Sequence, residues 1–137
     1  IHANLQALNA CMAHAKTQGI DRWALLGDLV GYGGNPQEVV DVAMQLADEG
    51  AWVIQGNHDA MAVLPPQADA SVGASTAAWT HEQLGPAQRD FLANLPLTEQ
   101  VEPADLIKYG ADAVQSQLGE GGFPALQRPD KTAWSLA

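Results

Sequence analysis

The chain has 137 residues, of which 47% are hydrophobic and 16% charged, so it is long and apolar enough for one domain with a core, and a disordered chain is excluded. Its formal net charge is −10, and six Lys and Arg residues are too few to form the basic face of a nucleic-acid-binding protein. The sequence shows no membrane-spanning run and no signal peptide, and its single cysteine suits a reducing compartment, so we expect a cytoplasmic protein without a membrane partner.

The first predicted helix covers residues 3–18, where apolar residues recur at helical spacing. Asn4 is a candidate cap at its start, and Cys11 falls on its apolar side, where we expect a core residue rather than a nucleophile. A short apolar run predicts a buried strand over residues 22–27, and a glycine-rich loop follows over residues 28–35.

The next predicted pair is a helix over residues 36–49 and a strand over residues 51–55. The helix start is indicated by Asn35, which can cap it, by proline at the first helical position, and by Glu38 three residues after the cap. With a further strand expected ahead of Ile1, the order becomes β-α-β-α-β. Right-handed crossovers then give a parallel sheet. Because the chain lacks an initiator Met, we expect it to be a fragment or a processed product.

The rest of the chain predicts helices without strands. Ser71 can cap a helix that runs to Leu84, and a second helix is expected over residues 86–94. We therefore divide the chain into an organised part, residues 1–98, and a poorly defined, loosely packed tail of the same domain, residues 99–137.

Polar side chains stand where the predicted strands end. Asp28 follows the first complete strand, and Asn57, His58 and Asp59 follow the next, while His2 lies near the start of the chain. Ligands of open α/β sheets bind at the carboxyl ends of the strands, and oxygen and nitrogen donors gathered there can hold metal ions. The sequence therefore predicts that these side chains converge at one edge of the sheet.

Each of these residues also has a purely structural interpretation. Asp28 and Asn57 are common turn residues, and the position after Gly56 suits an asparagine with left-handed backbone. His2 can be a frayed terminal residue. For Asp59 we favour a role as the cap of the following turn over orientation of the His58 ring.

The motifs together resemble one family. His2, Gly27-Asp28 and the run Gly-Asn-His-Asp at residues 56–59 have the order and spacing of the calcineurin-like metallophosphoesterases, above all of their small bacterial branch. The resemblance covers residues 1–98 and is absent beyond. It implies an α/β fold that is part of a metallophosphoesterase sandwich, truncated, with a parallel sheet flanked by helices.

The resemblance also implies a reaction. A water activated by two divalent metal ions would hydrolyse a small phosphomonoester or phosphodiester, with manganese the expected metal and iron, zinc, nickel or magnesium as alternatives. Asp28 would bridge the ions, and His2 and Asn57 would be further ligands. His58 would protonate the leaving oxygen and, with Asn57, contact the substrate. Tyr32 either lines the pocket or serves packing.

The family's remaining ligands are missing from this sequence. The family carries an aspartate just before the position of Ile1 and further histidines late in the chain, whereas no histidine follows His81 here. Three ligands are too few to hold two ions tightly. The alternative is therefore an inactive fragment that binds one metal weakly or acts as an interaction module. A nucleotide-binding doubly wound domain is a weaker third hypothesis, because no dinucleotide-type glycine loop follows a strand.

Overall fold

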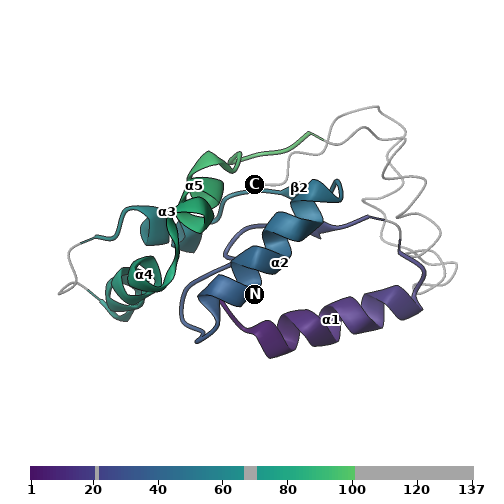
Figure 1. Cartoon of the computed structure of the whole chain (residues 1–137), viewed down its shortest axis with the longest axis horizontal. Helices are drawn as coiled ribbons and strands as arrows, with labels where there is room; N and C mark the ends of the chain where they lie inside the picture. The colour runs from purple at the N-terminus through teal and green to yellow at the C-terminus, as the bar shows by residue number, and fades with distance from the viewer. Residues whose placement is uncertain (21, 67–70, 101–137) are drawn as a thin grey trace, which may run out of the picture. The chain divides into compact units, whose positions relative to one another are not determined.

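The computed structural model describes residues 1–20, 22–66 and 71–100. Figure 1 shows the described helices and strands in chain order. They are α1 (Leu5–Thr17), β1 (Ala24–Leu25), α2 (Pro36–Asp48), β2 (Trp52–Val53), α3 (Asn57–Val63), α4 (Val72–Gln83) and α5 (Pro86–Asn94).

The chain divides into two compact units, residues 1–97 and 98–137. All the elements named above belong to the first unit, which is the one described below. The loosely packed tail that the sequence predicts over residues 99–137 lies outside the described residues from residue 101 onward.

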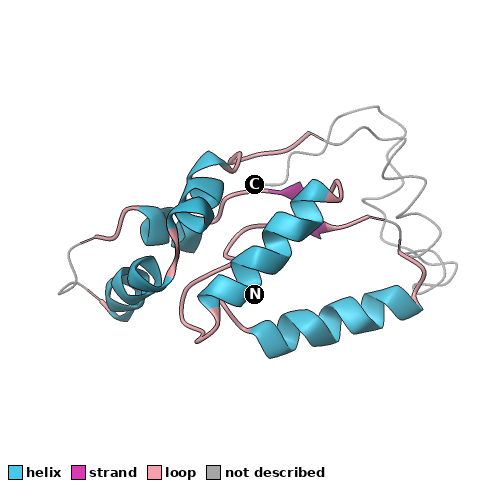
Figure 2. Cartoon of the chain, in the orientation of Figure 1, coloured by secondary structure: helices cyan, strands magenta, loops and turns pink. Residues whose placement is uncertain are grey.

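The sheet is parallel, as predicted, with Ala24 opposite Trp52 and Leu25 opposite Val53. Both strands are only two residues long, shorter than the apolar runs suggested. They end early because the chain turns at Gly27 after β1, and because Gln55 after β2 directs its N–H to the carbonyl of Pro96 (2.8 Å). Figure 2 shows the two strands among the helices of this α/β unit.

Local sequence signals position the helix starts. The Asn4 side chain accepts a hydrogen bond from the N–H of Ala7 (2.9 Å), and Ser71 accepts one from Ala74 (3.1 Å), so both predicted caps are present. The start of α2 differs from the prediction. The Asn35 side chain donates to the Glu38 carboxylate (3.3 Å) instead of capping the backbone, and Pro36 still opens the helix.

The hydrophobic core gathers side chains from loops as well as helices. Leu29 and Val30, in the loop after β1, are 1% and 0% exposed and pack with α2 and α5 residues. Burying such a side chain contributes about 1.5–3 kcal/mol, so these two residues anchor the loop firmly. The core cluster comprises Leu8, Leu29, Val30, Val39, Val40, Ala43, Val53, Ala62, Leu84 and Leu92.

One prediction about the core is wrong. Cys11 is exposed, although it was expected on the buried side of α1. The packed stripe of α1 consists of Leu5, Leu8 and Met12, with Leu8 its one fully buried residue. Cys11 is one position from Met12, which rotates it by about 100° around the helix and out of that narrow stripe.

Candidate functional site

The loop after β1 presents the Asp28 carboxylate at the end of the strand. Gly27 has a φ of +80°, and a Cβ on it would lie 2.5 Å from the backbone nitrogen of Gly56. Asp28 follows with a φ of 48°, in the left-handed region that aspartate tolerates better than most residues. Because Leu29 and Val30 are buried directly behind it, the carboxylate, whose side chain is 33% exposed, is held at the surface of the loop.

The Gly56 turn places the next group of polar residues against this carboxylate. The backbone N–H of His58 donates to Oδ1 of Asp28 at 3.1 Å. A Cβ on Gly56 would lie 2.3 Å from the same oxygen, so the approach requires glycine. The His58 ring, 9% exposed, is carried in the first turn of α3.

His2 reaches the same place from the start of the chain. Its N–H donates to the carbonyl of Asp28 (2.9 Å), so residues 1–3 run beside the Asp28 loop. Nδ1 of the His2 ring lies 3.2 Å from the carbonyl oxygen of Val30. A carbonyl can only accept, so Nδ1 carries a proton, and Nε2 faces Oδ2 of Asp28 at 3.9 Å.

Three rings pack together beside the carboxylate. We call His2, Tyr32 and His58 the ring cluster. The centroids of the two imidazoles are 4.9 Å apart at 88° between ring planes, and Tyr32 lies 5.2 Å from His2 and 4.6 Å from His58. Tyr32 is nevertheless 58% exposed, so it forms the outer layer of the cluster.

The buried side chain of Asp59 connects the loop after β1 to the turn at Gly56. Its carboxylate is fully buried and accepts hydrogen bonds from the N–H groups of Val30 (3.1 Å) and Gly56 (2.8 Å). Burial raises the pKa of this carboxyl, and the charge of Asp28 acts in the same direction, whereas the backbone N–H groups oppose the rise. In the described structure these bonds go to backbone and none goes to the His58 ring, as in the capping interpretation of Asp59.

Asn57 is the first residue of α3, and the sequence did not predict this helix. Its side chain is exposed and makes no hydrogen bond to the described residues. Asp59 was expected to cap a turn, but its position three residues after Gly56 completes a helix-start pattern with that residue. The structure thus brings His2, Asp28 and His58 into direct contact and leaves the Asn57 amide at the surface beside them.

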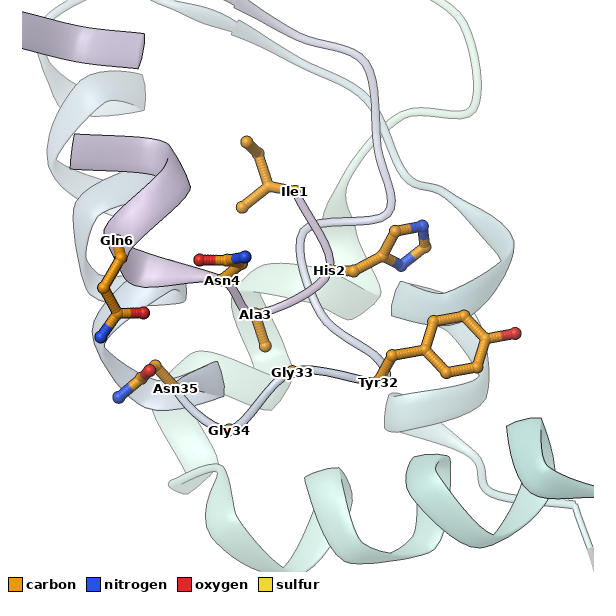
Figure 3. A pocket seen from close by; sticks show the side chains of 9 residues that line it. All are labelled: Ile1, His2, Ala3, Asn4, Gln6, Tyr32, Gly33, Gly34 and Asn35. Carbon is orange, nitrogen blue, oxygen red and sulfur yellow. The ribbon is translucent and has the colours of Figure 1, made fainter. Parts of the chain in front are cut away.

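A cavity of about 480 Å³ opens next to His2 and Tyr32. Figure 3 shows the rings of these two residues extending to the same side, with the amides of Gln6 and Asn35 at the other end of the view. Among the described residues, the lining includes no Asp, Glu, Lys or Arg side chain. It is formed by Ile1, His2, Ala3, Asn4, Gln6, Tyr32, Gly33, Gly34 and Asn35.

The donor set for metal is incomplete in the described part of the chain. No group of three or more His, Cys, Asp and Glu side chains is arranged there to hold an ion. Two donors do face one another, Nε2 of His2 and Oδ2 of Asp28. The hydrogen bond from Nδ1 to a backbone carbonyl is the arrangement that orients metal-binding histidines in general.

Sequence reasoning overlooked the contribution of Val30. Its carbonyl orients His2 and its N–H binds Asp59, so its backbone serves two side chains from other segments. The available signal was a buried apolar pair placed immediately after Asp28 inside a glycine-rich loop.

None of the helices in residues 1–20, 22–66 and 71–100 is long and apolar enough to cross a bilayer.

Comparison with known proteins gives a consistent result. A family model described as calcineurin-like phosphoesterase matches residues 1–132. The expectation that the likeness ends at residue 98 is therefore wrong. The three short motifs on which it rested all lie before that residue, whereas the matched pattern continues beyond them.

Two individual proteins are similar to the chain. An uncharacterized protein from Methanocaldococcus jannaschii is 34% identical over an alignment of 128 residues, which covers 90% of this chain and 51% of that protein. The crystal structure of a metallophosphoesterase from Sphaerobacter thermophilus shares 33% identity at a TM-score of 0.59, covering 72% of this chain and 39% of that one. The chain thus spans about half the length of the first relative and less of the second.

Proposed function

The chain belongs to the calcineurin-like phosphoesterase family, and from this premise we propose that it carries part of the site at which a metal-activated water hydrolyses a phosphomonoester or phosphodiester. The observation that supports the proposal most is the meeting of His2, Asp28 and His58. These residues come from three separate segments, and the fold joins them at the end of β1.

The residues present fit one divalent ion better than two. Nε2 of His2 and Oδ2 of Asp28 would bind it, with the exposed amide of Asn57 as a third donor. A bound divalent ion supplies positive charge against the phosphate and lowers the pKa of water. Manganese remains the expected metal, and a second ion would need donors beyond those described.

His58 is the proposed proton donor to the leaving oxygen. Its backbone is fixed by the Asp28 carboxylate, and its ring is held between His2 and Tyr32. Histidine exchanges protons near neutral pH, which suits a general acid for an alcohol leaving group. The burial of the ring leaves it few orientations, so the proton is delivered in a fixed direction.

Turnover of phenyl phosphate, a substrate with a poorer leaving group than nitrophenyl phosphate, by the purified chain with added manganese tests the proposal. We expect His58→Ala to lower kcat by roughly 10²–10⁴-fold, the usual contribution of a general acid. His14→Ala is the matched control, because His14 is an exposed histidine on α1 and should leave turnover unchanged. Equal turnover of the wild type and His58→Ala would remove His58 from this role.

A second function has its own supporting observation. The described residues hold no group of three His, Cys, Asp and Glu donors, which favours a chain that binds one ion weakly or acts as an interaction module. Titration calorimetry with manganese separates the two hypotheses. One or two tight sites favour the enzyme, whereas one weak site or none favours the inactive fragment.

A further inference from the structure

Tyr32 combines a strained backbone with a largely exposed side chain. Its φ is 58°, in the left-handed region where a tyrosine is rare and strained. Its side chain is 58% exposed, so burial offsets little of the free energy of this backbone strain. His2, Ala3 and Asp28 also have a positive φ, and histidine and aspartate tolerate this backbone better than tyrosine does. A strained, exposed aromatic residue at a functional site is a candidate for ligand contact.

The neighbours of Tyr32 hold it over the two imidazoles. A Cβ on Gly31 would lie 2.7 Å from Nδ1 of His58, and one on Gly33 would lie 2.2 Å from the carbonyl oxygen of His2. Both glycines therefore allow the loop to pass directly against the histidines. As a result the Tyr32 ring contacts both His2 and His58 and still faces solvent.

The polar end of Tyr32 has no hydrogen-bond partner in the part of the chain that the structure describes. Its hydroxyl lies 3.9 Å from where a Cβ on Gly73 would be, beside the first turn of α4. The cavity that Tyr32 lines has amide side chains and no charged one among the described residues. These surroundings suit a neutral group that carries a flat ring more than a second phosphate.

We propose that Tyr32 contacts the substrate and selects phosphoesters whose alcohol portion carries a flat ring, which stacks on the exposed tyrosine ring. The inference rests on the proposed function, because His58 and the metal donors would place the phosphate next to Tyr32. Offset or edge-to-face stacking between rings would raise affinity for a ring-bearing ligand roughly two- to tenfold over an alkyl one.

The test uses two ligands that are not hydrolysed, phenylphosphonate and methylphosphonate, with inorganic phosphate as a third. Each is titrated into the full chain loaded with Zn²⁺, which is diamagnetic, and the His58 ring resonances are followed by NMR. We expect the wild type and Tyr32→Phe to prefer phenylphosphonate, and Tyr32→Leu to lose the preference. Trp79→Leu, which alters an exposed aromatic residue of α4, is the matched control and should keep it.

The outcomes separate the two proposals. If inorganic phosphate moves the His58 resonances but Tyr32→Leu keeps the preference for the phenyl ligand, the selection by Tyr32 is overturned and the proposed function stands. If none of the three ligands moves them, the phosphate site itself is refuted and Tyr32 with it. Should Tyr32→Leu fail to fold, nuclear Overhauser contacts between the wild-type Tyr32 ring and bound phenylphosphonate decide, and their absence contradicts the stacking.

Discussion

The Asp28 carboxylate accepts the backbone N–H of His58 at 3.1 Å, although the two residues are 30 positions apart. One oxygen of the carboxylate thus positions the histidine, and the other faces Nε2 of His2. The carboxylate also lies at the start of α3, where backbone N–H groups favour negative charge. A single side chain therefore joins the proposed metal donors to the proposed general acid.

Replacing Asp28 by asparagine should separate these two roles. The amide oxygen of Asp28→Asn can still accept the His58 N–H, so the fold is retained, but the negative charge that would attract a cation is gone. We expect manganese affinity to fall by roughly tenfold or more, measured by titration calorimetry. Asp90→Asn, which removes an exposed charge on α5, is the control for net charge. Unchanged affinity in Asp28→Asn would exclude Asp28 as a ligand.

Gly56 should be intolerant of even one methyl group. An added Cβ would lie 2.2 Å from the backbone nitrogen of Asp28 and 2.3 Å from its Oδ1, and neither loop can move without breaking the Asp59 bonds. We expect Gly56→Ala to lower the free energy of unfolding by about 2 kcal/mol or more in urea titrations.

Gly34→Ala is the matched control for this substitution. A Cβ there meets nothing within 4 Å, and its φ is not in the left-handed region. Gly34→Ala should alter the free energy of unfolding by no more than about 0.5 kcal/mol. Alanine restricts the unfolded chain more than glycine does, which acts in the stabilising direction. Equal effects of the two substitutions would contradict the close approach of Gly56 to Asp28.

The parts of the fold that the sequence predicts well depend on neighbours in sequence. Asn4 and Ser71 cap helices three residues away, and Pro36 and Pro86 open α2 and α5. Strand length could not be predicted in this way, because it depends on where distant groups bind. The N–H of Gln55, for example, leaves the strand ladder for Pro96.

The site shows the same division between local and distant contacts. The polar residues at the strand ends were predicted, and their convergence is seen for His2, Asp28 and His58. The outer position of Tyr32 was not predictable, since it follows from a backbone conformation and from contacts with two remote histidines. The family likeness could name residue types, whereas only the fold shows which backbone groups hold them.

The tautomer of His2 can be observed directly. The bond from Nδ1 to the Val30 carbonyl requires the neutral ring to carry its proton on Nδ1, so ¹⁵N NMR at high pH should show Nε2 unprotonated. Added Zn²⁺ should then shift the Nε2 resonance of His2 more than the Nδ1 resonance. His14, exposed on α1, provides the internal control and should not respond. A neutral His2 ring protonated on Nε2 would contradict the assigned orientation.

Asp59 should make the stability of the metal-free chain depend on pH. Because burial raises its pKa above the ordinary value of 3.8, the folded state binds the proton more tightly than the unfolded state. The stability linked to this proton is fully present below pH 3.8 and is lost as pH rises through the raised pKa of the folded state.

The difference in unfolding free energy between wild type and Asp59→Asn isolates this effect, because the other carboxyl groups are common to both proteins. Measured by urea titration with chelator present, the wild-type value minus the variant value should decrease as pH rises above 3.8. Asp59→Ala leaves the N–H groups of Val30 and Gly56 without their acceptor. It should therefore lower the free energy of unfolding by about 1–3 kcal/mol across the whole pH range. A difference that grows with pH would mean that the carboxylate is held ionised by its two N–H donors, and that these outweigh its burial.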